Sequence, residues 1–370
     1  MPAADVRWTS SLPDAPPPRA PILGVLPGEG IGPEVVAASL QILDALPGRE
    51  RFEVRWGGLI GGEAERAYGV GLTQEVTDLC AWVFDRGGAV LAGPGGGRFV
   101  YDLRRRFDLF CKLAPIQPAP ELAALARVRG AEGVDLLVVR ENVAGAYLGR
   151  AEVRRGPEGV EVEHSFRYTE RDVRRVVQVA ASLARRRRGR LLVALKDGGL
   201  PALSDLWRDV ATSCASDLDL RCDNVDLVAY EIVQRPEALD VIVAPNLLGD
   251  VLVDVAGALM GSRGVTFSGN FAPDGAAVYQ TSHGAAFDIA GKDIANPVGQ
   301  ILSLAMMLRE SFGMAGAAAQ VEDAVRRVWR AGVRTRDVAE AGHRVVGTAE
   351  MGGRIADEVA RDAAGGRDVR

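Results

Sequence analysis

Two aspartates four residues apart, Asp250 and Asp254, are the side chains whose spacing points most directly to chemistry. They follow an apolar run, Val241–Ala244, that predicts a buried strand, and the helical pattern after it places both carboxylates on one helix face. Adjacent carboxylates repel each other unless a cation lies between them, and Mg²⁺ prefers oxygen ligands of this kind. A solvated acidic helix start is the simpler alternative. The apolar flank Val251–Val253 favours a metal site.

Basic side chains that follow two other apolar runs could act on an anionic substrate. Lys196 follows Leu191–Leu195, where burial would lower the pKa of its ammonium group and suit it to proton transfer. A lysine in this place could equally extend to solvent. Arg140 follows Val134–Val139, and α/β sheets place ligands at the carboxyl ends of their strands. The run Arg104–Arg106 could bind carboxylates in bidentate fashion or form a solvated helix face.

Strands alternate with helices along the whole chain, which predicts an α/β fold with a largely parallel sheet. The glycine-rich turn Gly28–Glu34 joins a strand to a helix and could hold phosphate, but its GxGxG spacing is not the dinucleotide-binding fingerprint. Residues 148–168 alternate charged and apolar side chains, which predicts an exposed hairpin, and Thr169 is a candidate cap for the next helix. Residues 279–292 predict a long polar loop.

The composition is that of an ordinary globular protein of 370 residues, with 48% hydrophobic and 25% charged residues and a net charge of -5. This charge gives no sign of nucleic-acid binding. The scattered cysteines form no CxxC pair or zinc motif, and no apolar run is long enough to span a membrane, so we expect a cytoplasmic protein with reduced thiols. Residues 1–20 are polar and proline-rich, which predicts a disordered leader.

A series of motifs, in this order, resembles the β-decarboxylating dehydrogenases, which include isocitrate, isopropylmalate, homoisocitrate and tartrate dehydrogenases. The resemblance extends from about Ile22 to Val359. The motifs are GEGIGPE at Gly28–Glu34, LRRRFDLF at Leu103–Phe110, VVRENVAGAY at Val138–Tyr147, NLLGDVLVD at Asn246–Asp254 and HGAAFDIAGKDIANP at His283–Pro297, with RTRDVAEAGHRVVGTAEMG nearer the end.

The resemblance implies an α/β fold of the isocitrate/isopropylmalate dehydrogenase type, with two α/β domains and not a standard Rossmann fold. We expect a large cofactor-binding domain from residues 21–114 and 266–370, and a central, dimerising domain from residues 115–265. The hairpin near 148–168 resembles the intersubunit arm of the family. In such enzymes the residues that match Lys196 and Asp226 enter the neighbouring active site, which implies a homodimer with shared sites.

The same resemblance assigns roles to individual residues. Tyr147 and Lys196 match the catalytic pair, and Asp226, Asp250 and Asp254 match the ligands of Mg²⁺ or Mn²⁺. The substrate-binding residues expected on this basis are Arg98, Tyr101, Arg104, Lys112 and Arg140. The residues expected at the cofactor are Gln280, His283, Gly284, Ala286, Asp288, Ile289 and Asn296. Asp288 implies NAD, because a carboxylate accepts hydrogen bonds from ribose hydroxyls and repels the 2′-phosphate of NADP.

Three positions depart from the family pattern. Ala114 stands where a third substrate-binding arginine is expected, in a segment that in the family resembles Asn-Leu-Arg-Pro, and Lys112 could replace the charge. Gly198 replaces an asparagine that follows the catalytic lysine, and Gln280 replaces a glutamate near the nicotinamide ribose. These departures, with Arg98 as a possible partner for a distal acid, favour an isocitrate-like or homoisocitrate-like substrate or a phosphonate analogue.

Other functions remain open at this stage. Tyr101 and its apolar neighbours Phe99 and Val100 could instead hold an alkyl group, as in 3-isopropylmalate dehydrogenase. Loss of the arginine also fits a non-catalytic regulatory subunit of a heteromeric isocitrate dehydrogenase, although Lys196 and Tyr147 are retained. A metal-dependent dehydrogenase that does not decarboxylate its substrate is a further alternative.

Overall fold

A single mixed sheet organises the chain. The structure, a computed structural model, describes residues 8–12, 19–125, 128, 131 and 133–365. Ten strands in these residues form the sheet, in the order β2-β1-β3-β12-β11-β4-β5-β10-β8-β9. Their bounds are β1 (Ile22–Leu26), β2 (Glu53–Trp56), β3 (Ala89–Ala92), β4 (Cys111–Ile116), β5 (Leu136–Glu141), β8 (Arg190–Leu195), β9 (Asp219–Asn224), β10 (Val241–Ala244), β11 (Phe267–Phe271) and β12 (Ala277–Thr281).

Two parallel halves of this sheet meet at antiparallel strands. The strands β2, β1, β3 and β12 pair in parallel on one side, and β5, β10, β8 and β9 do so on the other. Antiparallel pairing of β11 with β12 and β4, and of β4 with β5, joins the halves. Parallel neighbours need crossover helices, which explains the alternation of strands and helices in the sequence. The predicted α/β class is confirmed, with a mixed centre that a standard Rossmann fold lacks.

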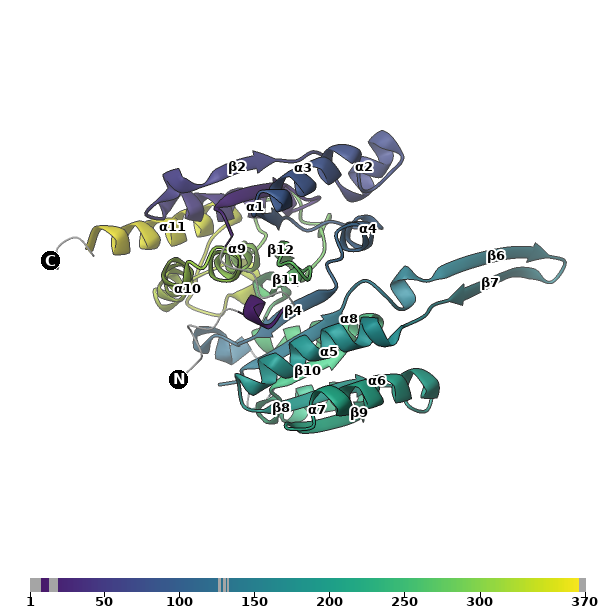
Figure 1. Cartoon of the computed structure of the whole chain (residues 1–370). Coiled ribbons are helices and arrows are strands. Elements are labelled where there is room, and N and C mark those ends of the chain that lie inside the picture. The colour runs from purple at the N-terminus through teal and green to yellow at the C-terminus, as the bar shows by residue number, and fades with distance from the viewer. Residues whose placement is uncertain (1–7, 13–18, 126–127, 129–130, 132, 366–370) are drawn as a thin grey trace.

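Helices cover both halves (Figure 1). The first half is covered by α1, α3, α9, α10 and α11, and the second by α5, α6, α7 and α8. The helix bounds are α1 (Gly32–Ala45), α2 (Gly61–Tyr68), α3 (Gln74–Asp85), α4 (Phe99–Arg106), α5 (Glu170–Arg185), α6 (Pro201–Cys214), α7 (Val225–Gln234), α8 (Asn246–Gly257), α9 (Val298–Glu310), α10 (Ala315–Arg330) and α11 (Thr348–Gly365). Two short strands, β13 (Val333–Arg334) and β14 (Arg344–Val345), form a separate pair.

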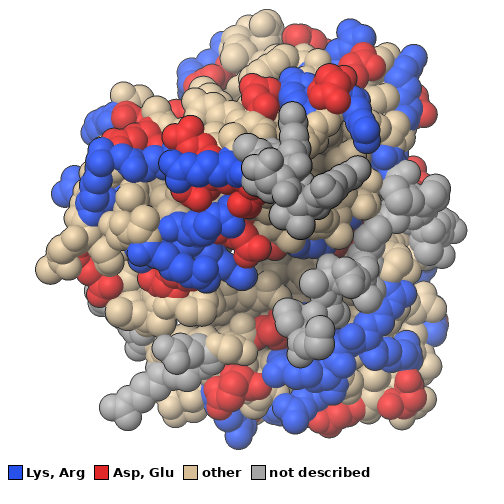
Figure 2. Space-filling view, turned by 90° about the vertical axis from the view of Figure 1, so that its left-hand side faces the viewer, with Lys and Arg blue, Asp and Glu red and all other residues tan. Residues whose placement is uncertain are grey.

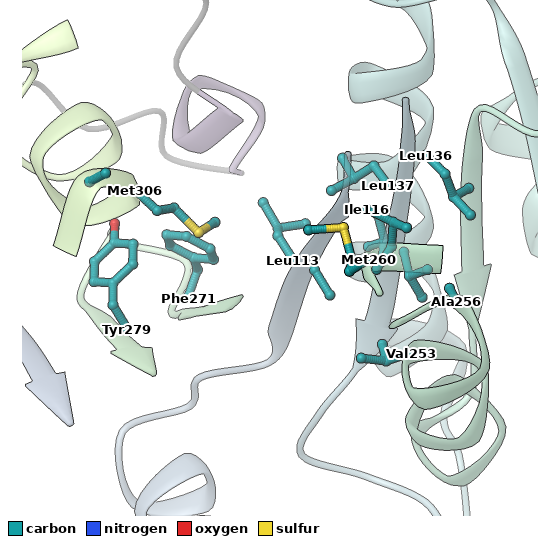
Figure 3. Packing of buried hydrophobic residues seen from close by; sticks show 14 of the residues in the cluster. Leu113, Ile116, Leu136, Leu137, Val253, Ala256, Met260, Phe271, Tyr279 and Met306 are labelled. Carbon is teal, nitrogen blue, oxygen red and sulfur yellow. The ribbon is translucent and has the colours of Figure 1, made fainter. Parts of the chain in front are cut away.

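The hydrophobic core is continuous across the junction of the two halves. Figure 3 shows Leu113 of β4 between Phe271 of β11 and Ile116, with Val253 of α8 nearby. All of these side chains are buried. The end of α8 is therefore held against the central strands by apolar packing, and its first turns are fixed at the carboxyl end of β5 and β10.

A hairpin projects from the body of the molecule (Figure 1). Its strands β6 (Arg150–Gly156) and β7 (Gly159–Ser165) pair with each other only, and every residue in them is exposed. The hairpin predicted for residues 148–168 is therefore confirmed. Thr169 caps α5 in a capping box with Asp172, as its position before the helix predicts.

The prediction that residues 1–20 form a disordered leader is wrong for the part that is described. Trp8–Ser11 forms a short 3-10 helix, and Thr9 is buried. The backbone amide of Thr9 donates to Glu310 Oε2 at 3.0 Å, and Arg186 hydrogen-bonds Ser10. These contacts join the segment to α9 in one half and to the end of α5 in the other. Residues 1–7 and 13–18 lie outside the described residues.

The division into residues 21–114 with 266–370 and residues 115–265 stays a prediction, since the sheet runs across both boundaries and the first one falls inside β4. No helix in the described part of the chain is long and apolar enough to cross a membrane. Figure 2 shows basic and acidic side chains interspersed on one face, in keeping with the small net charge.

Candidate active site

Three buried cations lie together at the centre of the sheet. Arg104 from the last turn of α4, Lys112 from β4 and Arg140 from β5 are 5%, 4% and 1% exposed. Lys112 stands directly opposite Arg140 in the β4–β5 register. Burial lowers the pKa of Arg104 to about 9 and that of Lys112 to about 7, and repulsion from the neighbouring cations is the second cause. Buried charges of one sign are costly, so this cluster is suited to an anionic ligand.

Asp250 connects this cluster to a tyrosine. Its carboxylate forms an ion pair with Arg140 and accepts a hydrogen bond of 2.9 Å from the hydroxyl of Tyr147. Burial opposes ionisation of Asp250, but Arg140 and Tyr147 together hold its pKa below the usual range. Burial and the neighbouring carboxylate raise the pKa of Tyr147 above its usual value. The phenol is therefore protonated at neutral pH and can act as a proton donor.

Residues of α4 and the turn before it surround Tyr147. The ring of Tyr101 lies 5.0 Å from that of Tyr147, between centroids. Arg98 donates to the backbone carbonyl of Tyr147 at 3.0 Å and lies 3.6 Å from the carboxylate of Asp102. The guanidinium groups of Arg98 and Arg104 stand 5.4 Å and 5.7 Å from the Tyr101 ring. The wall of the site beside Tyr147 is thus aromatic, and Arg98 already has partners.

Asn246 belongs to the same contact network, a role that the sequence alone did not predict. This residue is fully buried at the start of α8, and its Oδ1 accepts from Nε and Nη2 of Arg140 at 3.1 Å and 2.7 Å. Its amide Nδ2 donates to the carbonyl of Ala144, and its backbone amide donates to the hydroxyl of Tyr168. A side chain at Gly249 would meet the Arg140 stem at about 3 Å. Asn246 therefore fixes the direction in which Arg140 points. A polar residue opening an apolar helix was the available signal.

The expected metal ligands fall into two groups. Asp250 and Asp254 lie one turn apart on α8, as predicted, and Asp254 is 3.1 Å from Arg263. Their surroundings are more open than the apolar flank indicated, because Val251 is 53% exposed. Asp226 instead pairs with Lys196 Nζ at 2.7 Å, at the start of α7. Lys196 holds the pKa of this exposed carboxyl below its usual range.

The donor set suits a hard cation but is incomplete in one chain. No group of three or more histidine, cysteine, aspartate or glutamate side chains that could hold a metal ion is found among the described residues. Asp250 and Asp254 supply carboxylate oxygens on a rigid helix, which are the ligands that Mg²⁺ and Mn²⁺ favour. A third carboxylate would have to come from elsewhere, and Asp226 on the same chain is bound to Lys196.

The glycine-rich turn holds the polar loop that the sequence assigned to the cofactor. Gly30 has a φ of 58°, and a Cβ on it would lie 2.1 Å from the carbonyl oxygen of Ala285. The amide of Ile31 donates to that same oxygen at 2.9 Å. Ala286, the next residue, has a φ of 43°, which is uncommon for alanine. The glycines here permit close contact between two backbone segments, so the loop is fixed against the start of α1.

The loop offers unused polar groups. Ser282 Oγ and His283 Nε2 are buried and have no hydrogen-bond partner in the described residues. Burial lowers the pKa of His283, which therefore stays neutral at pH 7. Orphaned polar atoms of this kind fit a loop that binds a polar ligand. Asp288 is exposed, and Lys292 Nζ donates to its backbone carbonyl at 2.7 Å, which leaves the carboxylate available.

The other residues expected at the cofactor lie around this loop. Gly284 is exposed, and Ile289 packs against the buried cluster of Ile31, Val35 and Ala295. Asn296 is buried, and its amide donates to Asp337 at 3.0 Å. Gln280 pairs with Ser268 where β12 meets β11. That these residues bind the cofactor stays a prediction.

A sequence model of the isocitrate/isopropylmalate dehydrogenase family matches residues 22–355. The chain belongs to this family. The 3-isopropylmalate dehydrogenase of Nitratidesulfovibrio vulgaris is 38% identical over 362 residues, an alignment that covers 90% of this chain and 98% of the relative. The 3-isopropylmalate dehydrogenase of Heyndrickxia coagulans is 36% identical and covers 92% of this chain and 97% of its own length.

A solved structure of the isocitrate/isopropylmalate dehydrogenase family also matches. The isocitrate dehydrogenase of Methylococcus capsulatus superposes with a TM-score of 0.81 at 29% identity, over 92% of this chain and 99% of that one. Membership confirms the predicted resemblance, the fold and the enzyme class, a decarboxylating dehydrogenase that acts on a CH–OH group.

Proposed function

We propose that this enzyme uses NAD and Mg²⁺ or Mn²⁺ to oxidise and decarboxylate a 3-alkylmalate of the 3-isopropylmalate class to a 2-oxo acid. The observation that carries the proposal is the linked set of Arg140, Asp250 and Tyr147 beside buried cations. It joins an anion-binding group, a candidate metal ligand and a protonated phenol in one contact network. The names of the relatives, 3-isopropylmalate dehydrogenases at 36% to 38% identity, support this substrate class.

The surroundings of Arg98 support an alkyl substituent over an acidic one. The sequence favoured an isocitrate-like or phosphonate substrate because Arg98 could hold a distal acid. In the structure Arg98 donates to the Tyr147 carbonyl and lies near Asp102, so two acceptors already compete for it. The aromatic ring of Tyr101 stands beside Tyr147 and offers an apolar surface. The isopropylmalate alternative therefore replaces the isocitrate-like substrate as the main proposal.

The residues of this chain divide the work of the reaction. Arg104 and Arg140 bind carboxylates of the substrate and orient it, since guanidinium groups bind them in bidentate fashion. Lys196 takes the proton of the 2-hydroxyl, and Tyr147 protonates the carbon that loses CO₂. Metal held by Asp250 and Asp254 would favour negative charge on the substrate oxygen. The loop that contains Asp288 would hold NAD, which would supply the acceptor for the hydride.

An exposed apolar surface supports a homodimer with shared sites. The residues of this surface, which we call the α7–α8 face, are Leu227, Tyr230 and Val233 on α7 and Leu247 and Val251 on α8. Large contiguous apolar patches are typical of interaction sites. In the sequence Asp226 directly precedes Leu227, and Asp250 directly precedes Val251. Pairing of two such faces would bring Asp226 and Lys196 of one subunit towards Asp250 of the other and complete the ligand set. A cytoplasmic location remains a prediction.

A substrate panel tests the proposed function. Purified protein with NAD and Mn²⁺ would be assayed for NADH formation with 3-isopropylmalate, isocitrate, homoisocitrate and a phosphonomethylmalate. We expect the highest kcat/KM with 3-isopropylmalate. Preference for isocitrate, homoisocitrate or the phosphonate would restore the acidic-substituent hypothesis. Failure with every compound, in protein shown to be folded, would favour a non-catalytic subunit.

A further inference from the structure

Lys112 and Ala114 lie on the same face of β4. Side chains two residues apart in a strand point to the same side of the sheet, about 7 Å apart. The register places Lys112 opposite Arg140 and Ala114 opposite Val138. Lys112 is thus level with the carboxyl end of β5, next to Arg140, whereas Ala114 is one pair further from the site. A cation at position 112 starts closer to the substrate than one at position 114 would.

The ammonium group of Lys112 has no side-chain partner of its own. The described residues give it no hydrogen bond and no ion pair, although Lys112 is only 4% exposed. It stands opposite Arg140 in the strand register, and the charges that act on it are those of Arg104, Arg140, Asp250 and Asp254. A buried ammonium in this position is costly until an anion binds beside it. The environment therefore points to a carboxylate of the substrate as its missing partner.

The use of lysine in this chain supports a specific role for the residue. Lys112, Lys196 and Lys292 are the lysines of a sequence with 44 lysine and arginine residues. Lys196 forms an ion pair with Asp226, and Lys292 donates a hydrogen bond to the backbone carbonyl of Asp288. Where this chain places a basic residue on its surface or in an ion pair, it almost always uses arginine. A lysine buried beside Arg104 and Arg140 is consistent with a function that needs a compact point charge.

We propose that Lys112 is the third carboxylate-binding cation of this active site, displaced two residues along one face of β4 from the position where the family pattern has arginine and this chain has Ala114. This inference rests on the proposed function. Lysine at position 112 in place of arginine at position 114 keeps three cations in the site but replaces one guanidinium by an ammonium. An ammonium contacts a carboxylate oxygen as a single charge, whereas a guanidinium holds both oxygens in a fork.

The two positions are therefore coupled. Arginine at position 114 with Lys112 still present would place a fourth cation on one face, among like charges that already repel each other. Arginine at 114 is expected to function only when Lys112 is replaced by a neutral residue. Asparagine is the natural choice, because the family pattern has it at this position. Ala114→Arg should therefore weaken substrate binding when Lys112 is present and strengthen it when asparagine replaces Lys112.

The test compares Lys112→Met, Ala114→Arg and the double variant Lys112→Asn/Ala114→Arg with the parent. Isothermal titration would give the Kd of 3-isopropylmalate with Mn²⁺ and without NAD, and a separate titration would give the Kd of Mn²⁺ alone. Steady-state assays would give KM and kcat. Arg326→Met is the control, since it removes a basic charge from a half-exposed position on α10, outside the site. Thermal unfolding would establish that each variant is folded.

We expect Lys112→Met to weaken binding of 3-isopropylmalate by about tenfold to a hundredfold, the usual effect of losing a charge-assisted hydrogen bond. Its Mn²⁺ affinity should not fall, and Arg326→Met should bind 3-isopropylmalate like the parent. Ala114→Arg alone should also bind it more weakly than the parent, and the double variant should return to within a few-fold of the parent.

Several results would overturn the inference. Parent-like binding by Lys112→Met would remove Lys112 from the substrate site. A change confined to Mn²⁺ affinity would make it a counter-ion of Asp250 and Asp254. A folded double variant no better than Lys112→Met would show that the two positions do not share a role. If the parent itself neither binds nor oxidises 3-isopropylmalate, the proposed function fails, and the role of Lys112 fails with it.

Discussion

The hydroxyl of Tyr147 lies 2.9 Å from Asp250 Oδ2, so the proposed proton donor is bonded directly to a proposed metal ligand. The same carboxylate forms an ion pair with Arg140. A change in the charge around Asp250, such as metal or substrate binding, would therefore alter the hydrogen bond that Tyr147 makes. The hydrogen bond to Asp250 orients the Tyr147 hydroxyl. The same carboxylate, together with burial, raises the pKa of Tyr147 and keeps its phenol protonated.

Tyr147→Phe removes the proton donor without removing the ring that packs against Tyr101. We expect kcat to fall by about 100-fold to 10,000-fold, the usual range for loss of a general acid, with little change in the KM for NAD. Tyr68→Phe, the same chemical change at an exposed residue, should leave both constants unchanged. Steady-state kinetics of the two variants provide the measurement. A Tyr147→Phe enzyme with parental kcat would exclude the phenol from proton transfer.

Asn246→Ala should weaken substrate binding, because Arg140 would lose the acceptor of two of its hydrogen bonds. A hydrogen bond to a charged group contributes about 1.5–3 kcal/mol, so we expect kcat/KM to fall by roughly tenfold to a hundredfold. Asn246→Asp keeps an acceptor for Arg140 and should lose less. If both variants keep the parental kcat/KM, Arg140 is oriented by other contacts.

Lys196→Met and Tyr147→Phe should each lose most activity alone and recover part of it when mixed. On the shared-site proposal Lys196, which pairs with Asp226 at 2.7 Å, serves the site of the neighbouring subunit, whereas Tyr147 serves the site of its own chain. A mixed dimer then has one site with both defects and one site with neither, so we expect up to about half of the parental activity per mixed dimer. The mixture would be assayed after subunit exchange has been verified with labelled protein. No recovery after verified exchange would mean that each chain uses its own Lys196.

NAD should be preferred to NADP by kcat/KM, and Asp288→Asn should reduce that preference. Asp288 is exposed, and on the proposed cofactor assignment its carboxylate would repel the 2′-phosphate of NADP. Comparing kcat/KM for both cofactors in the parent and the variant measures the effect. An enzyme that prefers NADP would require a different assignment of the 283–297 loop.

Part of this site could be predicted from the sequence because it depends on local spacing. Asp250 and Asp254 are one helical turn apart, and that relationship holds wherever α8 lies in the fold. The helix cap at Thr169 and the hairpin before it could also be predicted from the sequence, since caps and turns depend on neighbouring residues. The role of Tyr147, in contrast, came only from the resemblance to known dehydrogenases.

Contacts between distant segments could not be predicted in the same way. The bond from Asn246 to Arg140 joins residues far apart in the sequence, and it depends on β5 pairing with β10. The aromatic contact of Tyr101 with Tyr147, and the placement of Lys112 opposite Arg140, likewise depend on strand order and register. The exposure of Val251 on α8 could not be predicted either, because an apolar flank does not reveal which of its side chains the rest of the chain covers.

The most direct test of the central claim measures CO₂ and NADH together. Purified protein with 3-isopropylmalate, NAD and Mn²⁺ should release one CO₂ for each NADH formed, and both products should be absent with a chelator. Asp250→Asn should retain the fold and lower kcat by more than about 100-fold. Mutating a residue that only supports a metal ligand already lowers activity or metal affinity by about 10-fold to 100-fold, and Asp250 is a proposed ligand itself. NADH without CO₂ would indicate a dehydrogenase that does not decarboxylate. Full activity of Asp250→Asn in chelated buffer would contradict the site described here.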